Sequence, residues 1–163
     1  MKARRIFLFV FMLLSIAINI FIIVEGATNG GDSSNQSLGI TNWLIDIAKE
    51  IDPNSGFASD SNFAHVVTRK LFGHFGLFAL DGILSTLMFV FMDEFMERKK
   101  EIIISILMYG FFFAFVSELV QYFTPGRYMS MVDVLIDYSG YVIAGAVTYF
   151  ISFAIIHNKK TNH

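Results

Sequence analysis

The chain of 163 residues contains no cysteine and only two prolines. Without cysteine it can form neither a disulfide scaffold nor a thiolate metal site, and it has no cysteine nucleophile. Charged residues are also scarce, at 16%, against about 25% in a typical soluble domain. The formal net charge is −2, and no basic stripe with interleaved aromatics is present, so the sequence does not predict a nucleic-acid partner.

Hydrophobic residues are abundant instead, at 55%, and they include 19 phenylalanines. A transmembrane helix needs roughly 20 predominantly apolar residues. Four stretches meet this requirement, namely Ile6–Val24, Leu71–Met92, Ile102–Phe123 and Val132–Ile156. The sequence therefore predicts an all-α membrane protein with four transmembrane helices.

The first stretch follows a basic N-terminus, as a secretory signal peptide would. Its apolar core, residues 6–24, is longer than the roughly 7–15 residues of a cleavable signal. The residues after it, Val24 to Thr28, contain no Ala-x-Ala cleavage site. We therefore expect a retained transmembrane helix.

Lysine and arginine predict the orientation, because they are enriched in cytoplasmic segments. With both termini in the cytoplasm, eight of these residues are internal and four external. The internal ones are Lys2, Arg4, Arg5, Arg98, Lys99, Lys100, Lys159 and Lys160, and the external ones are Lys49, Arg69, Lys70 and Arg127. We expect a multi-pass protein with both termini inside.

One long segment, residues 25–70, separates the first helix (residues 1–24) from the three-helix core (71–156) and a short cytoplasmic tail (157–163). Its first part, residues 26–35, has the composition of a flexible polar linker. Apolar residues then recur at helical spacing from Ile40 to Ile51, which predicts a short amphipathic helix. That helix, with Trp43, suits either the lipid head-group layer or a lid over the external helix ends.

Polar residues of three predicted spans reach the same depth, near the external surface. With about 1.5 Å of rise per residue, His74 and Asp137 each lie one turn inside their helices. Glu118 lies near the external end of its own. The candidate ligand-binding residues at this level are Arg69, Lys70, His74, Glu118, Gln121, Arg127, Asp133 and Asp137.

Spacing predicts that these residues face inward together. The pairs 70 and 74, 118 and 121, and 133 and 137 are three or four residues apart, so each pair shares a helix face. A charge near the bilayer centre costs about 2.5–3.5 kcal/mol even on lenient scales, which favours pairing inside the bundle. We expect an external polar pocket roofed by the turn from Pro125 to Arg127; the alternative is an ion-pair network that only fixes helix packing.

Asp81 differs from this set, because it lies near the predicted bilayer midplane. It either marks a proton or cation path or pairs with a nearby polar residue. Candidate partners are Ser85, Ser105 and Ser139.

Two motifs carry a family resemblance. The first is the run Glu118-Leu-Val-Gln-Tyr-Phe-Thr-Pro-Gly-Arg127 followed by Ser130-Met-Val-Asp133, and the second is Arg69-Lys-x3-His74-Phe. Together with Gly140 and Gly145 they resemble the VanZ-like membrane protein family over roughly residues 69–145. Two positions depart from the family pattern: Asp137 stands where members usually have asparagine, and Asp81 where the pattern is usually apolar.

The resemblance implies a small multi-pass protein of the bacterial cytoplasmic membrane. It also implies a link to reduced susceptibility to teicoplanin-type glycopeptide antibiotics, although many members have no such link. Carried over by position, it marks as motif residues Arg69, Lys70, His74, Glu118, Gln121, Pro125, Gly126, Arg127, Asp133, Gly140 and Gly145.

The leading functional hypothesis is a non-enzymatic cell-envelope protein without a metal or cofactor. Its expected partners are membrane lipids, a lipid-linked cell-wall precursor or a lipoglycopeptide, with Arg127 and Arg69 or Lys70 holding phosphate. Glu118, Gln121 and Asp133 would position the arginine.

Two alternatives stay open. One is an enzyme of the outer leaflet, a hydrolase or transferase with His74 and Glu118 as base and acid, or with a divalent cation held by histidine and carboxylates. The other is a proton or cation carrier that uses Asp81.

Overall fold

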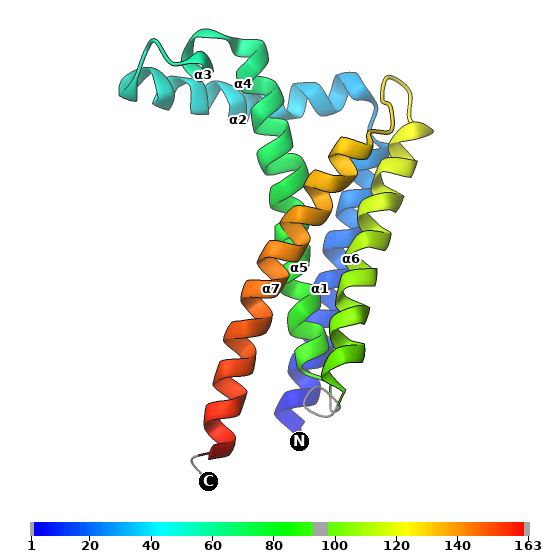
Figure 1. The fold of residues 1–163 in the computed structure, drawn as a ribbon. Helices are drawn as coiled ribbons and strands as arrows, with labels where there is room; N and C mark the ends of the chain where they lie inside the picture. The colour runs from blue at the N-terminus through cyan, green and yellow to red at the C-terminus, as the bar shows by residue number, and fades with distance from the viewer. Residues whose placement is uncertain (1, 93–97, 162–163) are drawn as a thin grey trace.

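The computed structural model describes residues 2–92 and 98–161, and all regular elements in these ranges are helical. Four long helices run side by side along most of the molecule (Figure 1). They are α1 (Lys2–Ala27), α6 (Lys99–Tyr122), α7 (Met131–Thr161) and a composite helix of α4 (Ser61–Thr68), the π-helical segment η1 (Arg69–Gly76) and α5 (Leu77–Val90). Two further helices, α2 (Gly30–Ile51) and α3 (Gly56–Ser59), lie at the end of the bundle opposite both termini (Figure 1).

All four predicted spans are confirmed as helices long and apolar enough to cross a membrane. The second extends further than predicted, since it begins at Ser61 rather than Leu71. The reason is a helix cap, because the Asp60 side chain accepts hydrogen bonds from the backbone N–H groups of Asn62 and Phe63. Polar residues therefore continue the same helix beyond its apolar part.

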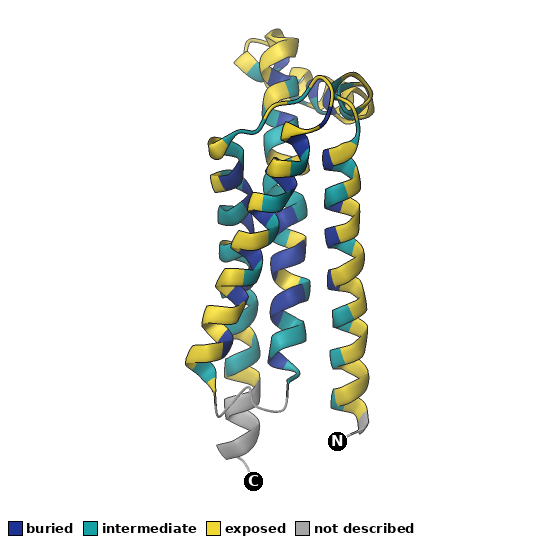
Figure 2. Cartoon of the chain, turned by 90° about the vertical axis from the view of Figure 1, so that its right-hand side faces the viewer, coloured by how far each residue is buried: buried dark blue, intermediate teal, exposed yellow. Residues whose placement is uncertain are grey.

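The exterior of the bundle is apolar, and its interior holds buried polar side chains beside an apolar core. Large apolar side chains are exposed on all four long helices. Buried positions follow the inward face of each helix (Figure 2). Among the largest fully buried side chains are Glu118, Asp81, Asp137 and Ser117. An apolar exterior with charged side chains turned inward is the arrangement that a lipid environment favours.

The segment after α1 is helical, so the prediction of a flexible linker over residues 26–35 was wrong. Helix α2 begins at Gly30, ten residues before the predicted amphipathic helix. The Asn29 side chain caps it by accepting a hydrogen bond of 3.1 Å from the N–H of Asp32. The N–H of Gly30 donates to the carbonyl of Pro125 at 3.2 Å, which fixes this end of α2 to the loop between α6 and α7.

Helices α5 and α7 pack closely through glycine. A Cβ on Gly82 would lie 2.3 Å from the carbonyl oxygen of Tyr141, and one on Gly140 would lie 2.4 Å from that of Phe75. Small residues at such crossings let helix backbones approach in a membrane. The crossing brings the adjacent η1 segment against the first turns of α7.

Candidate functional site

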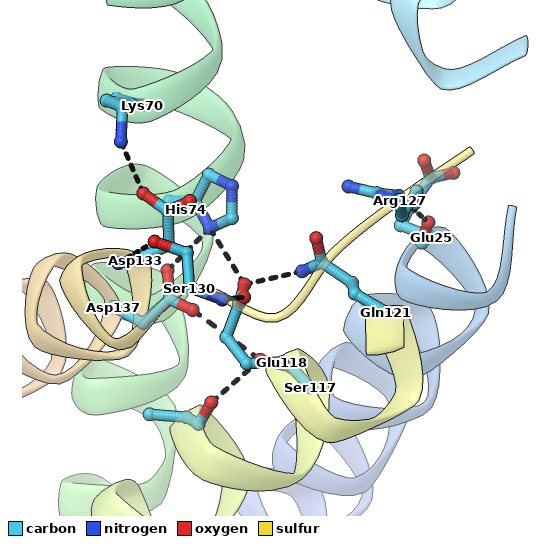
Figure 3. Close-up of polar contacts among 11 residues, drawn as sticks. Glu25, Lys70, His74, Ser117, Glu118, Gln121, Arg127, Ser130, Asp133 and Asp137 are labelled. Carbon is cyan, nitrogen blue, oxygen red and sulfur yellow. Dashed lines mark hydrogen bonds and ion pairs between the residues drawn. The ribbon is translucent and has the colours of Figure 1, made fainter. Parts of the chain in front are cut away.

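The centre of the site is His74 on η1, which faces carboxylates from two other helices (Figure 3). Its Nδ1 atom lies 3.0 Å from Oδ1 of Asp137 on α7 and 3.8 Å from Oε1 of Glu118 on α6. Both carboxylate side chains are fully buried, and His74 is only 14% exposed. The segment that carries the imidazole is π-helical, a form of helix that occurs frequently at functional sites.

Glu118 is held firmly in place by its own helix and by the start of α7. Gln121 Nε2 donates to its Oε1 at 2.6 Å, and the backbone N–H of Ser130 donates to its Oε2 at 3.0 Å. The Ser130 hydroxyl in turn accepts a hydrogen bond from the N–H of Asp133, so this stretch also begins α7. One carboxylate thereby fixes α7 against α6.

Asp137 and Asp133 have separate partners. The Ser117 hydroxyl donates to Oδ2 of Asp137 over a long 3.5 Å, which leaves His74 as its main contact. Asp133, one turn nearer the end of the bundle, forms an ion pair with Lys70. Lys70 is therefore engaged by Asp133 rather than by the two buried carboxylates.

Arg127 is held by main-chain carbonyls rather than by a carboxylate. Its Nη1 donates to the carbonyl oxygens of Glu25 at 2.7 Å and Thr28 at 3.4 Å, at the C-terminal end of α1. The expectation that Glu118, Gln121 and Asp133 would position this arginine was therefore wrong: its partners are the unsatisfied carbonyls of a helix end. The Nε and Nη2 atoms make no hydrogen bond to the described part of the chain.

The side chain of Arg69 makes no hydrogen bond or ion pair with residues 2–92 or 98–161. It lies close enough to Arg127 that, after burial, its positive charge is the strongest influence lowering the pKa of that guanidinium. Arginine nonetheless stays protonated in proteins. Two cationic groups thus lie near one another, and the carboxylates of Glu118 and Glu25 are close enough to offset part of their repulsion.

Two neighbouring cavities adjoin these residues. The larger has a volume of about 280 Å³ and the smaller about 180 Å³, and Arg69, His74, Gln121 and Arg127 line both. The larger one also reaches apolar side chains and the N-terminal half of α2, through Ser33, Gln36, Ser37 and Ile40. Gly126 and Asp133 line the smaller one.

All eight residues predicted from the sequence lie around these cavities or contact residues that do. Sequence reasoning missed the contributions of Ser117, Ser130 and Thr68. Thr68 lies just before the motif. A single sequence does not show which serine hydroxyl or backbone N–H will bind a carboxylate. The carbonyl partners of Arg127 could not be predicted either, because every residue has a backbone carbonyl.

Asp81 belongs to a different layer of the bundle. Its Oδ1 accepts hydrogen bonds from Ser15 at 3.2 Å and Asn19 at 2.9 Å, both on α1. The predicted side-chain partners were wrong: Ser85 donates to the Asp81 carbonyl oxygen, and its hydroxyl also bonds to Tyr141, while Ser105 donates within its own helix.

The third candidate partner of Asp81, Ser139, likewise donates to a carbonyl of its own helix, that of Ile136 at 2.8 Å. Helix α1, which carries no charge within its apolar stretch, supplies the polar partners instead.

The family model described as VanZ/LLP1 matches residues 8–153 of the chain. This match covers nearly the whole described bundle, including α1, and is therefore longer than the region that carries the motifs. No curated protein and no solved structure matches the chain.

Proposed function

The chain belongs to the VanZ/LLP1 family and is a multi-pass membrane protein, and from this we propose that it binds a phosphate-bearing lipid head group. The bound molecule would be a lipid or a lipid-linked cell-wall precursor of a bacterial cytoplasmic membrane. The site would be the pair of cavities around Arg69 and Arg127, and the protein would face the outer leaflet there. The excess of lysine and arginine at the end with both termini supports this orientation.

The observation that carries the proposal is the set of unused donor groups on the two arginines. Arg69 has no side-chain partner in the described chain, and Arg127 keeps two donor atoms unused. Guanidinium groups bind phosphate oxygens through paired N–H donors. An anion between the two side chains would relieve their mutual repulsion and use those donors.

The shape of the larger cavity suits a lipid rather than a small soluble anion. Its lining includes the apolar side chains of Phe21, Ile22, Phe72 and Phe78 as well as the two arginines. The adjoining outward faces of the helices are apolar. A head group at the arginines with an acyl chain along the phenylalanines would match both parts of this lining.

The same arrangement would connect lipid binding with a change in antibiotic susceptibility. A lipoglycopeptide carries an acyl tail. A protein that binds acyl chains and anionic groups at the outer leaflet would compete with the antibiotic for the lipid molecules that it contacts. We propose lowered susceptibility to teicoplanin-type glycopeptides as a consequence of this binding.

Arg69→Ala is the cleanest test, because the side chain has no hydrogen bond or ion pair to lose within the described residues. The purified protein in nanodiscs is titrated with phosphatidic acid, and diacylglycerol with the same tails serves as the control ligand. We expect the variant to bind phosphatidic acid at least tenfold more weakly, with no change in melting temperature. Arg98→Ala is the matched control, because Arg98 lies near the other end of the bundle and is paired with Glu101.

Two outcomes would refute the proposal. Equal affinity of the wild type for phosphatidic acid and diacylglycerol would remove the role of phosphate. Equal affinity of Arg69→Ala and the wild type would remove the role of the cavity. Competition by inorganic phosphate shows whether the head group alone is sufficient for binding.

A second candidate function is hydrolysis or transfer at a lipid-linked intermediate. It is favoured by the 3.0 Å contact of His74 with Asp137, which would orient the imidazole as a general base. Lipid profiling of a deletion strain separates the two functions. A covalently changed envelope lipid supports the enzyme, whereas an unchanged lipid profile supports binding alone.

A further inference from the structure

We propose that His74, Glu118 and Asp137 form a binding site for a divalent transition-metal ion, with Zn²⁺ as the representative ion. The three side chains come from η1, α6 and α7 and converge on one point (Figure 3). Each offers one donor atom, and the three donor atoms lie within 4.8 Å of one another. The sequence has no short ligand spacing of the kind that marks many zinc sites, because the ligands lie on separate helices.

The two distances that involve His74 are close to those of a loaded site. Zn²⁺ binds imidazole nitrogen and carboxylate oxygen at about 2.0–2.2 Å, so its ligand atoms are separated by roughly 3.3–3.5 Å. His74 Nδ1 lies 3.0 Å from Asp137 Oδ1 and 3.8 Å from Glu118 Oε1. The third separation, between the Glu118 and Asp137 donor atoms, is at most 4.8 Å, so these two carboxylates would have to move toward each other to centre an ion.

The charges also favour a cation. Glu118 and Asp137 are both fully buried, and a single imidazole faces both of them. Among the nearby cationic side chains, Lys70 pairs with Asp133 and Arg127 with the carbonyls of α1, and Arg69 forms no ion pair with either carboxylate. Buried carboxylates need compensating charge, and a divalent ion bound by neutral imidazole would supply it.

Surrounding hydrogen bonds already orient the two carboxylates. Gln121 and the Ser130 N–H hold Glu118, and Ser117 reaches the second oxygen of Asp137. Metal ligands in proteins are generally oriented by such outer contacts.

A second, independent observation concerns the adjoining cavity. The hydroxyl of Thr68 is buried, with the residue only 2% exposed, and has no hydrogen-bond partner. Thr68 lines the 280 Å³ cavity together with His74 and Asp137. A buried hydroxyl without a partner is rare in proteins, and a polar ligand in the cavity would provide one.

Three protein ligands leave at least one coordination position for an exogenous ligand. The cavity at His74 and Asp137 is also lined by Arg69 and Arg127. A phosphate oxygen on the ion would therefore lie on the side of the guanidiniums. This last step rests on the proposed function, whereas metal binding itself does not.

The test uses the full chain, purified in detergent with any tag removed and dialysed against Zn²⁺. Metal content is measured by inductively coupled plasma mass spectrometry and affinity by isothermal titration. We expect one Zn²⁺ per chain in the wild type and at least tenfold weaker binding in Asp137→Asn and Glu118→Gln. Asp133→Asn is the matched control, because this nearby acid is outside the ligand group, and it should retain the ion.

A measurement on the wild type avoids dependence on variants that fail to fold. X-ray absorption at the zinc edge should show one nitrogen ligand from imidazole with oxygen ligands at about 2.0–2.2 Å. Absence of stoichiometric zinc overturns the proposal. So does a shell of several imidazoles, since that would place the ion at the other histidines.

The two proposals fail in different ways. If the protein takes up no zinc but still binds phosphatidic acid, the metal site alone is overturned. Zinc binding that depends on Asp137, in a protein with no preference for phosphatidic acid over diacylglycerol, overturns the head-group proposal alone.

Discussion

Replacing Gly140 with alanine should force η1 away from α7 and weaken the contact between His74 and Asp137. The new Cβ would lie 2.4 Å from the carbonyl oxygen of Phe75, the residue next to His74. Because that oxygen belongs to the backbone, no side-chain rotation can relieve the overlap. Gly140 lies one turn after Asp137, so a displacement of η1 from α7 at Gly140 would also displace His74 from Asp137.

The size of the effect follows from the same contact. Real Cβ atoms essentially never approach another heavy atom closer than 3.0 Å, so the two segments must separate by about half an ångström or more. Overpacking of this kind costs about 1–3 kcal/mol of unfolding free energy. The 3.0 Å distance from His74 Nδ1 to Asp137 Oδ1 would then approach the limit of a hydrogen bond.

The assay is equilibrium unfolding in mixed micelles, followed by circular dichroism. Gly73→Ala is the matched control, because a Cβ at that position of the same η1 segment would have no atom within 4 Å. We expect the control to be neutral or slightly stabilising, since alanine favours helix over glycine. A Gly140→Ala protein as stable as the control would refute the close backbone contact and the reasoning built on it.

Three further predictions concern other parts of the bundle. Asp81→Asn should keep the stability of the wild type in the same unfolding assay, because the amide retains an oxygen that accepts the hydrogen bonds from α1 and removes a buried charge. Asp81→Leu should lose about 1–3 kcal/mol of unfolding free energy, because it leaves the donors of Ser15 and Asn19 unpaired. Asn29→Ala should remove the cap of α2, at a cost of about 0.5–2 kcal/mol, and speed amide hydrogen exchange in its first turn. Ser37→Ala should remove the 2.7 Å hydrogen bond to His65 and increase exchange where α2 meets α4, with little effect on the four long helices.

The long apolar stretches made the four spans predictable, because a bilayer demands length and hydrophobicity that few other structures need. The meeting of His74, Glu118 and Asp137 was predictable from helix rise and direction. Three helices with alternating directions bring charges near their ends to one level, and unpaired charges avoid lipid. Pairing inside the bundle followed from those two facts.

Other features depended on contacts that a single sequence does not contain. Residues 26–35 have a linker-like composition, yet Asn29 caps a helix there and Gly30 bonds to Pro125 across the chain. Arg127 was expected to face carboxylates, but the free carbonyls at the end of α1 are nearer. Both outcomes were decided by which backbone groups remained unsatisfied when the helices packed.

The polar layer around Asp81 and the site around His74 are separate, and the geometry of one helix shows why. On a helix, Asp81 lies seven residues and therefore roughly 10.5 Å beyond His74, on nearly the same face. Phe78 lies between them on that face, and it is only 2% exposed within the apolar core. A proton or cation moving between the two layers would have to displace this ring. The arrangement therefore favours a structural role for Asp81, which ties α1 to the bundle, and leaves ligand chemistry to the residues around His74.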